Sequence, residues 1–453
     1  MYKKSNFIIF LYLFFLFGVA VATYIYGMLI LKIHPHFIDQ FNNMDFSSLP
    51  FDHEELTLNL INTNQYFQTY DGPYPELGDL KFYTGKYPLV SITISSIAKI
   101  SENYYFIIIV KNLVFFSIVF WISYNYSKYS GKKYLDFFVI LTLLFYNPYN
   151  FHVASAWYFE DFACALLLPS LYLILVSKSP TRYLIVFYLI IILFFSKSSM
   201  TIFCFIFPLI IMANEYFSEK KVIYLPILAT IFCSAIWGGY SFNKTGYFAF
   251  FLNNSSFNQK QLSIAQNDKF HKIYPHLTID TIQHYGIQKI IQEKEKYGIF
   301  EFKNEWDFHK LFKIRNKKYI EENLDRVIKD AFMKFRFIFF EIYEDARRYE
   351  DYKKNKNKID YSMILNRLIL NFSILLAIIN LYKKFKMKQN ISKEIYFIFI
   401  LGLIIPLYLI GWATSKHLVG ISNTAIIYLF AIYNHRITFY IEKIIKKNFK
   451  FQI

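Results

Sequence analysis

The sequence is poor in cysteine and lacks the common motifs of soluble enzymes. Its three cysteines, Cys164, Cys204 and Cys233, lie within apolar segments, so they form neither a disulfide framework nor a metal-binding CxxC spacing. The chain also contains no Gly-rich phosphate loop, no HExxH, no GxSxG and no EF-hand pattern. These absences exclude chemistry of those kinds and leave the cysteines as small packing residues.

What the sequence has in abundance is apolar surface. Hydrophobic residues make up 55% of the 453 residues and aromatic residues 21%, and the mean hydropathy is positive, at +0.27. A water-soluble fold would leave too much of this surface exposed, whereas a bilayer solvates it. The composition therefore predicts an all-α polytopic membrane protein.

The apolar runs are long enough to cross a membrane. A helical span needs roughly 20 mostly apolar residues to cross a hydrocarbon core of about 30 Å. The first run, from Phe7 to Leu31, is longer than a signal-peptide core and lacks a small-residue cleavage site, so we interpret it as an uncleaved span. Divided at the charged breaks, the runs predict ten spans, at 7–31, 104–124, 134–149, 158–177, 183–197, 199–217, 222–241, 361–382, 394–412 and 418–434.

The basic residues predict the orientation of these spans. If Lys3 and Lys4 are cytoplasmic, every second loop falls on the same side, and each of these loops is basic, as the positive-inside rule requires. Membrane orientation therefore explains the net charge of +17 better than a nucleic-acid partner, which would need basic residues on a soluble surface. The same orientation puts residues 32–103 and 242–360 on the outer side.

Three regions follow from this organisation. Residues 1–241 are predicted to form a transmembrane core with the first outer segment, residues 242–360 a large mixed outer segment, and residues 361–453 the last spans and a basic cytoplasmic tail. The first outer segment carries nine carboxylates against four lysines, which agrees with an outer location. In the second, apolar residues recur every three or four positions over 324–335, which predicts an amphipathic helix at the membrane interface.

Short motifs follow one another along this framework. The acidic cluster Asp52-His53-Glu54-Glu55 comes after the first span, and Lys86 precedes a Pro-Leu pair that opens a short membrane-edge helix. Glu160-Asp161 begins the fourth span, Lys197-Ser198-Ser199 forms a tight outer hairpin, and Ser415-Lys416-His417-Leu418 opens the last span. In this order, the motifs resemble the GT-C superfamily of polyprenyl-phosphate-dependent glycosyltransferases, and most of all its mannosyl- and aminoarabinosyl-transferase branch.

The resemblance implies a GT-C-like fold and a reaction outside the cytoplasmic membrane of a bacterial-type cell. A sugar would pass from a polyprenyl-phosphate carrier to an envelope lipid, glycan or protein. Such a transfer needs a carboxylate base for the acceptor hydroxyl and positive charge for the departing phosphate. The sequence departs from the family at Leu324, where Pro is usual, and at His417, where an aromatic residue is usual.

The resemblance assigns the base to Asp52. The alternative is that Asp52 is a solvated carboxylate or the N-cap of a helix that includes Glu55. Glu54 and Glu55 could compete for the same role or hold a divalent cation together with Asp52, although an acidic helix start is the simpler interpretation of both. No other cofactor is expected.

The remaining candidates are cations and carboxylates at the outer membrane boundary. Lys86, Lys197 and Lys416 could bind the carrier phosphate, and for each the alternative is snorkelling to lipid headgroups. Glu160 and Asp161 adjoin an apolar span, where a charge is costly enough to indicate function, unless the span begins one turn later.

Two other functions stay open. An O-antigen-type polymerase or ligase also has many spans and a large outer loop, but those families favour Arg-rich outer loops, whereas an acidic cluster follows the first span here. A transporter of lipid-linked glycans should show internal repeats and broken helices. The first five predicted spans are not repeated in the last five, and the intramembrane charges Lys111 and Arg367 have no evident partner in the sequence.

Overall fold

The described part of the chain is almost entirely helical. The computed structural model describes residues 54–69, 77–101, 104–130, 136–137, 139–141, 143, 159–177, 179–250, 290–340, 361–410 and 415–449. Within these ranges there is no β-strand, and an isolated antiparallel bridge joins Gln68 to Phe82. The all-α prediction is confirmed for this part of the molecule.

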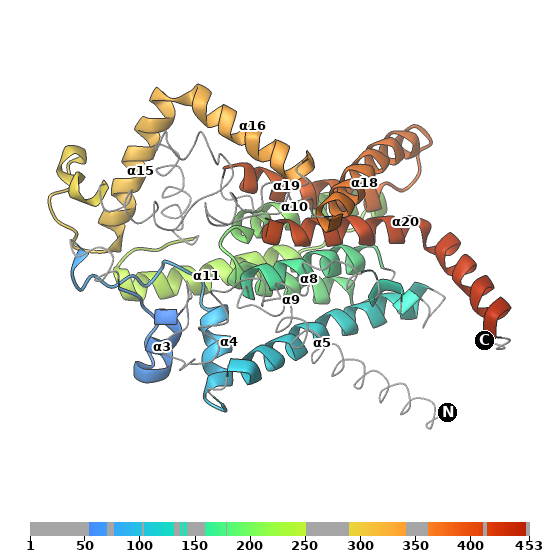
Figure 1. The fold of residues 1–453 in the computed structure, drawn as a ribbon, viewed down its shortest axis with the longest axis horizontal. Coiled ribbons are helices and arrows are strands. Elements are labelled where there is room, and N and C mark those ends of the chain that lie inside the picture. The colour runs from blue at the N-terminus through green and yellow to red at the C-terminus, as the bar shows by residue number, and fades with distance from the viewer. Residues whose placement is uncertain are drawn as a thin grey trace.

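The described helices are shown in chain order by colour in Figure 1. In order they are α3 (Glu54–Thr63), α4 (Leu89–Ala98), α5 (Tyr104–Ser130), α8 (Phe159–Leu175), α9 (Arg182–Ser196), α10 (Met200–Glu219), α11 (Leu225–Thr245), the 3-10 turn η4 (Lys294–Tyr297), α15 (Glu305–Glu322), α16 (Leu324–Phe340), α18 (Tyr361–Lys386), α19 (Ser392–Ile410) and α20 (Ser415–Phe449).

Among the described residues, five helices contain a stretch that is long and apolar enough to cross a membrane. These stretches are Ile109–Tyr129 in α5, Met200–Glu219 in α10, Leu225–Thr245 in α11, Ile364–Lys386 in α18 and Ser392–Leu409 in α19. Shorter apolar stretches occur in α4, α8, α9 and α20. The chain is therefore a helical membrane protein.

The predicted spans coincide closely with these helices. The spans predicted at 199–217 and 222–241 are α10 and α11, and the one predicted at 394–412 is α19. The span predicted at 7–31 lies outside the described residues, as does most of the span predicted at 134–149. The count of ten spans stays a prediction.

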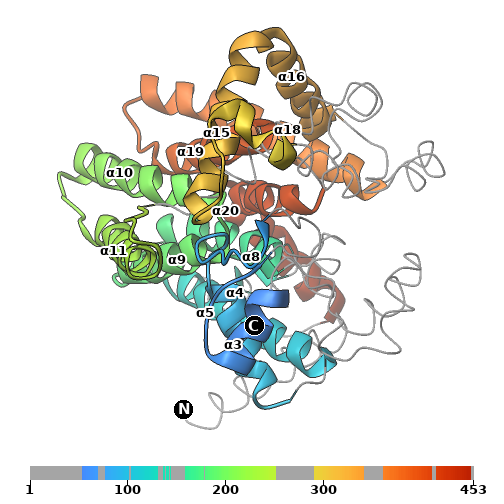
Figure 2. The same ribbon diagram turned by 90° about the vertical axis from the view of Figure 1, so that its left-hand side faces the viewer.

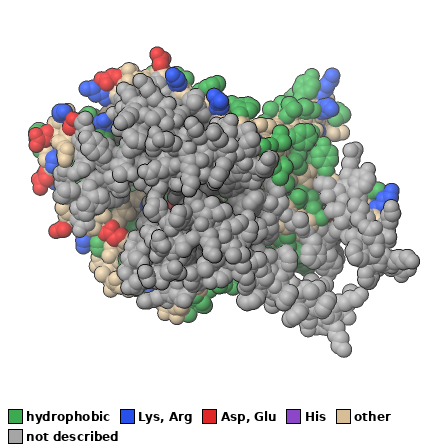
Figure 3. All heavy atoms as spheres, in the orientation of Figure 1, with side chains coloured by type: hydrophobic (Ala, Val, Ile, Leu, Met, Phe, Trp, Pro, Cys, Tyr) green, Lys and Arg blue, Asp and Glu red, His purple; other side chains and the backbone are tan. Residues whose placement is uncertain are grey.

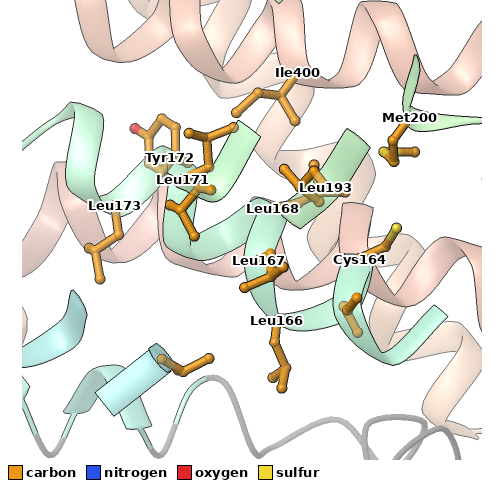
Figure 4. Packing of buried hydrophobic residues seen from close by; sticks show 14 of the residues in the cluster. Cys164, Leu166, Leu167, Leu168, Leu171, Tyr172, Leu173, Leu193, Met200 and Ile400 are labelled. Carbon is orange, nitrogen blue, oxygen red and sulfur yellow. The ribbon is translucent and has the colours of Figure 1, made fainter. Parts of the chain in front are cut away.

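Helix α8 lies at the centre of the bundle. It packs against α5, α9, α19 and α20, and its side chains are buried without interruption from Phe162 to Leu175. Figure 4 shows Leu166 and Leu168 pointing away from α8 in different directions, with Leu193 of α9 and Ile400 of α19 packed nearby. A helix that is hydrophobic all round is expected in the core of a large bundle or a membrane, and α8 meets that description.

Helix α20 approaches α8 closely because small residues face each other. A Cβ atom on Gly420 would lie 2.8 Å from the carbonyl oxygen of Cys164, so this position has no room for a side chain. One turn further along, Asn423 Nδ2 donates to the carbonyl oxygen of Ala165 at 2.8 Å. Small residues and interhelical hydrogen bonds are the usual means of packing helices in a membrane, where the hydrophobic effect between helices is weak.

At one end of the bundle, which we call the Arg182 end, ion pairs join the spans. Arg182 at the start of α9 pairs with Glu215 near the end of α10 at 3.0 Å, and Tyr396 of α19 donates its hydroxyl to Glu215 at 2.6 Å. Lys384 near the end of α18 pairs with Glu394 at the start of α19 at 2.8 Å. Several of the loops predicted to be cytoplasmic therefore lie together at this end.

The opposite end, which we call the Glu305 end, carries helices that are not spans. Helix α15 begins there with Glu305 and continues through Asn323 into α16 (left and top of Figure 1). The end of α16 packs against α18 and α19, and Asn371 Nδ2 of α18 donates to the carbonyl oxygen of Phe339 at 2.9 Å. The amphipathic stretch predicted over 324–335 is helical, as expected.

Where Figure 3 colours the surface between the two ends, it is largely apolar. Charged side chains of both signs gather at the left, over α15 and α16, and Lys and Arg appear again at the right-hand tips, with hydrophobic side chains over α18 between them. Leu368, Phe372 and Leu375 on α18 are 63%, 55% and 57% exposed. Exposed apolar residues at these positions are expected where lipid covers the protein.

Candidate functional site

At the Glu305 end, residues 82–87 between α3 and α4, here called the 82–87 turn, are held from several sides. The backbone groups of Gln68 and Phe82 exchange hydrogen bonds of 3.0 and 2.8 Å. At the other end of the turn, the Tyr87 hydroxyl shares a hydrogen bond of 2.8 Å with the Thr201 hydroxyl of α10, and the Tyr87 ring packs edge-on against Trp237 of α11. In Figure 2, which views the molecule from this end, the segment lies next to α15 and in front of α8.

Glu305, which lies far away in the sequence, forms hydrogen bonds to the middle of this turn. Asn304 caps α15 by accepting from the Trp306 amide at 2.9 Å, which directs the first helical residue, Glu305, inward. Glu305 Oε2 accepts from the backbone amides of Tyr83 at 3.0 Å and Thr84 at 3.1 Å. The first turn of α15 is therefore hydrogen-bonded to the first predicted outer segment.

The Glu305 carboxyl group lies in a dry environment. The residue is only 1% exposed, and Oε1 has no hydrogen-bond partner among the described residues. Burial raises the pKa of Glu305 to about 7, although the amides of Thr84 and Tyr83 act in the opposite direction. A carboxyl group with a pKa near neutrality can hold or release a proton under physiological conditions.

Tyr66 holds the backbone of the turn at Lys86. The Tyr66 hydroxyl donates to the carbonyl oxygen of Lys86 at 2.8 Å and also lies within hydrogen-bond reach of Ser91. Burial raises the pKa of Tyr66 well above its usual value, and the nearby Tyr240 and Glu160 raise it further. The Lys86 backbone is thus bonded to a buried hydroxyl whose pKa also responds to the charge of Glu160 in α8.

Two lysines are buried at the same end. Lys197 follows the last residue of α9 and is 7% exposed, and the hairpin there is tight because the Met200 amide donates to the Lys197 carbonyl oxygen at 2.9 Å. Lys111 of α5 is 2% exposed, and its Nζ lies 4.7 Å from the centre of the Phe162 ring at the start of α8. A cation this close to an aromatic face is attracted to the ring.

The structure gives a structural role to Glu55. Its Oε1 accepts from both the amide and the hydroxyl of Thr69, each at 2.6 Å, so it fixes the strand-like segment after α3. Glu54 is the first described residue of α3, and the interpretation of an acidic helix start stays a prediction. Asp52 lies outside the described residues, and its role as the base stays a prediction.

The other predicted residues can be placed along their helices. Glu160 and Asp161 lie within helix α8 (Phe159–Leu175) and not before it. Lys416 lies in the first turn of α20, as the motif predicted. Among the described residues, no group of three His, Cys, Asp or Glu side chains is arranged to hold a metal ion.

Comparison with known proteins assigns no family. No family model, no curated protein and no solved structure matches this chain. The chemistry of the Glu305 end is therefore read from its residues.

Taken together, the Glu305 end presents carboxyl groups and lysines on a rigid aromatic and backbone frame. Lys86 and Lys197 are basic side chains of this end, and Glu305 is a carboxyl group whose pKa is close to neutrality. Sequence reasoning missed Glu305, because it lies in an ordinary charged helix start.

Proposed function

We propose that this protein is a membrane glycosyltransferase that moves a sugar from a polyprenyl-phosphate carrier to an envelope acceptor at the Glu305 end. The observation that supports this most is that the segments of two separate motifs are tied together at one end of the bundle: Tyr87, next to Lys86, shares a hydrogen bond of 2.8 Å with Thr201, which follows the Lys197 hairpin. Glu160 of a third motif acts electrostatically on Tyr66, which donates to the Lys86 carbonyl oxygen. The resemblance of these motifs to the GT-C superfamily supplies the reaction.

The orientation follows from charge. The Arg182 end collects the basic loops that contain Lys220, Lys221 and the run from Lys383 to Lys393, so by the positive-inside rule it faces the cytoplasm. The Glu305 end then faces outward, where the carrier phosphate lies at the outer headgroup level.

The proposed reaction is a displacement at the anomeric carbon of the sugar. The oxygen of the acceptor hydroxyl forms a bond to that carbon while the bond to the phosphate oxygen breaks, and the electron pair leaves with the phosphate. A carboxylate, assigned to Asp52 by the resemblance, takes the hydroxyl proton. Lys86 and Lys197 stabilise the negative charge on the departing polyprenyl phosphate.

The test is transfer by the purified full-length protein in lipid nanodiscs, supplied with a panel of polyprenyl-phosphate sugars and an envelope lipid extract as acceptor. Lys86→Met should reduce transfer by about a hundredfold, because a charge-assisted contact to phosphate is lost. The matched control is Lys99→Met, since Lys99 is an exposed lysine just after α4 at the same end. Its transfer should stay near the wild-type rate.

Two results would contradict the proposal. Equal transfer by wild type and Lys86→Met would remove Lys86 from the site. Transfer from polyprenyl-diphosphate glycans, with none from any monophosphate donor, would instead favour the polymerase or ligase alternative.

A further inference from the structure

Lys86 and Glu305 are connected through the backbone of the 82–87 turn. Glu305 accepts from the amides of Tyr83 and Thr84 at 3.0 and 3.1 Å, and Tyr66 donates to the carbonyl oxygen of Lys86 at 2.8 Å. Two side chains from two other elements therefore fix the chain immediately before Lys86 and at Lys86 itself.

Among the described residues, the groups around Glu305 are mainly uncharged. Tyr240 of α11 faces it, Tyr83 belongs to the turn it holds, and His309 lies one turn further along α15. Lys244 of α11 lies with its Nζ 5.8 Å from the centre of the Tyr83 ring. Among the described residues, no Lys or Arg forms an ion pair with Glu305, so the backbone amides are its principal partners.

We propose that Glu305 is a positioning residue for Lys86: the large outer segment uses this carboxyl group to fix the turn that presents Lys86 to the carrier phosphate. The consequence for Lys86 rests on the proposed function. The grip of Glu305 on the turn does not, because it stands on the two amide hydrogen bonds alone.

The physical reason is preorganisation. A cation stabilises a departing phosphate best when it is already in place, and a displacement of about 1 Å can cost about a hundredfold in rate. Hydrogen bonds from amides to an ionised carboxylate are stronger than those to a neutral acceptor. Removing the Glu305 carboxyl group should therefore loosen the turn without removing Lys86.

The first experiment is a double-mutant cycle on polyprenyl-phosphate binding to the full chain in nanodiscs. Glu305→Ala should raise the Kd for polyprenyl phosphate by about tenfold. In a Lys86→Met background, the same change should alter the Kd by less than about twofold. Glu301→Ala, an exposed glutamate just before α15, is the matched control and should bind like wild type.

An equal loss of affinity in both backgrounds would overturn the proposal, because Glu305 would then act independently of Lys86. If Glu305→Ala does not fold, Glu305→Gln takes its place in the same cycle. Glutamine keeps one acceptor oxygen and cannot ionise. The phosphate of the ligand itself titrates near pH 6, so the readout is the difference between the two proteins: wild-type affinity should show an additional change around pH 7 that Glu305→Gln lacks.

The second experiment separates this proposal from the proposed function. Hydrogen exchange at the amides of Tyr83 and Thr84 should be slow in wild type, faster in Glu305→Ala and unchanged in Glu301→Ala. Unchanged exchange in Glu305→Ala would contradict the claim that Glu305 fixes the 82–87 turn. Faster exchange in a protein that does not bind polyprenyl phosphate at all would overturn the proposed function and leave the grip of Glu305 on the turn intact.

Discussion

The two ends of the bundle hold their buried charges in different ways. At the Arg182 end, acidic and basic side chains meet directly: Arg182 pairs with Glu215 at 3.0 Å, and Lys384 pairs with Glu394 at 2.8 Å. At the Glu305 end, Glu305 is held by the backbone amides of Tyr83 and Thr84.

The difference indicates that the ion pairs of the Arg182 end stabilise the bundle, here called the brace, whereas the Glu305 end is a functional site. A buried charge with an opposite charge beside it has its field largely cancelled, and its loss leaves the partner uncompensated. A buried carboxyl group held by backbone amides, such as Glu305, keeps more of its field, and such groups concentrate where ligands bind or protons move. We therefore expect substitutions at the Arg182 end to reduce stability and those at the Glu305 end to reduce function.

The largest expected effect comes from separating α8 from α20. These two helices connect the Arg182 end to the Glu305 end, so both ends should be disturbed together. Gly420→Leu would press a side chain against the Cys164 carbonyl oxygen, since even a Cβ would lie 2.8 Å away. The loss of stability should reach or exceed the roughly 1–3 kcal/mol typical of overpacking, because backbone cannot move aside. The measurement is the yield of monodisperse protein and its melting temperature in detergent.

Gly402→Leu provides the matched control. Gly402 of α19 is exposed, and a Cβ there would meet nothing within 4 Å. Its melting temperature should stay close to that of wild type; an equal loss in both variants would mean that the α8–α20 contact is not specially tight.

The next effect concerns the brace alone. Glu215→Gln should destabilise the protein by about 3 kcal/mol, because it leaves the largely buried Arg182 without its nearest opposite charge. Glu219→Gln should cost less than about 1 kcal/mol, since Glu219 is more exposed and lies 3.7 Å from Arg182. Unfolding free energies would measure both, and equal values would contradict the brace.

The smallest expected effect is the pH dependence that Glu305 gives to the stability of the protein. Its pKa is raised in the folded protein, from 4.5 to about 7, so its contribution to stability is fully present below pH 4.5 and is lost as the pH rises through about 7. The full shift corresponds to roughly 3 kcal/mol, and relaxation of the turn should reduce it to about 1–2 kcal/mol. The melting temperature of Glu305→Gln should therefore fall less between these two pH values than that of wild type.

Parallel melting curves in wild type and Glu305→Gln across that interval would show that Glu305 does not titrate there. Glu301→Gln controls for the loss of an acidic side chain at the surface.

The sequence predicted the helices well because their signals are local. Apolar runs bounded by charges gave the limits of α10 and α11 to within a few residues, and Pro88-Leu89 correctly opened α4. The tight hairpin at Lys197 was also predicted, because only a few residues separate two apolar runs. Such features depend on neighbouring residues and can be read without the fold.

The contacts of the candidate site could not be predicted, because they join residues far apart in the chain. Glu305 reaches amides 222 and 221 residues away, and nothing near it in the sequence distinguishes it from a surface glutamate. Lys111 showed no partner in the sequence because Phe162 lies over it only after α5 packs on α8. The side chains of Glu54 and Asp161 lie outside what the structure describes.

The most direct test of a functional Glu305 end is photocrosslinking with a diazirine-bearing polyprenyl phosphate, followed by peptide mapping. We expect crosslinks within residues 83–91 and 197–201, which unlabelled polyprenyl phosphate removes by competition and polyprenol does not. Crosslinks at the Arg182 end, or crosslinks spread evenly over the lipid-facing helices and insensitive to competition, would contradict a carrier site at the Glu305 end.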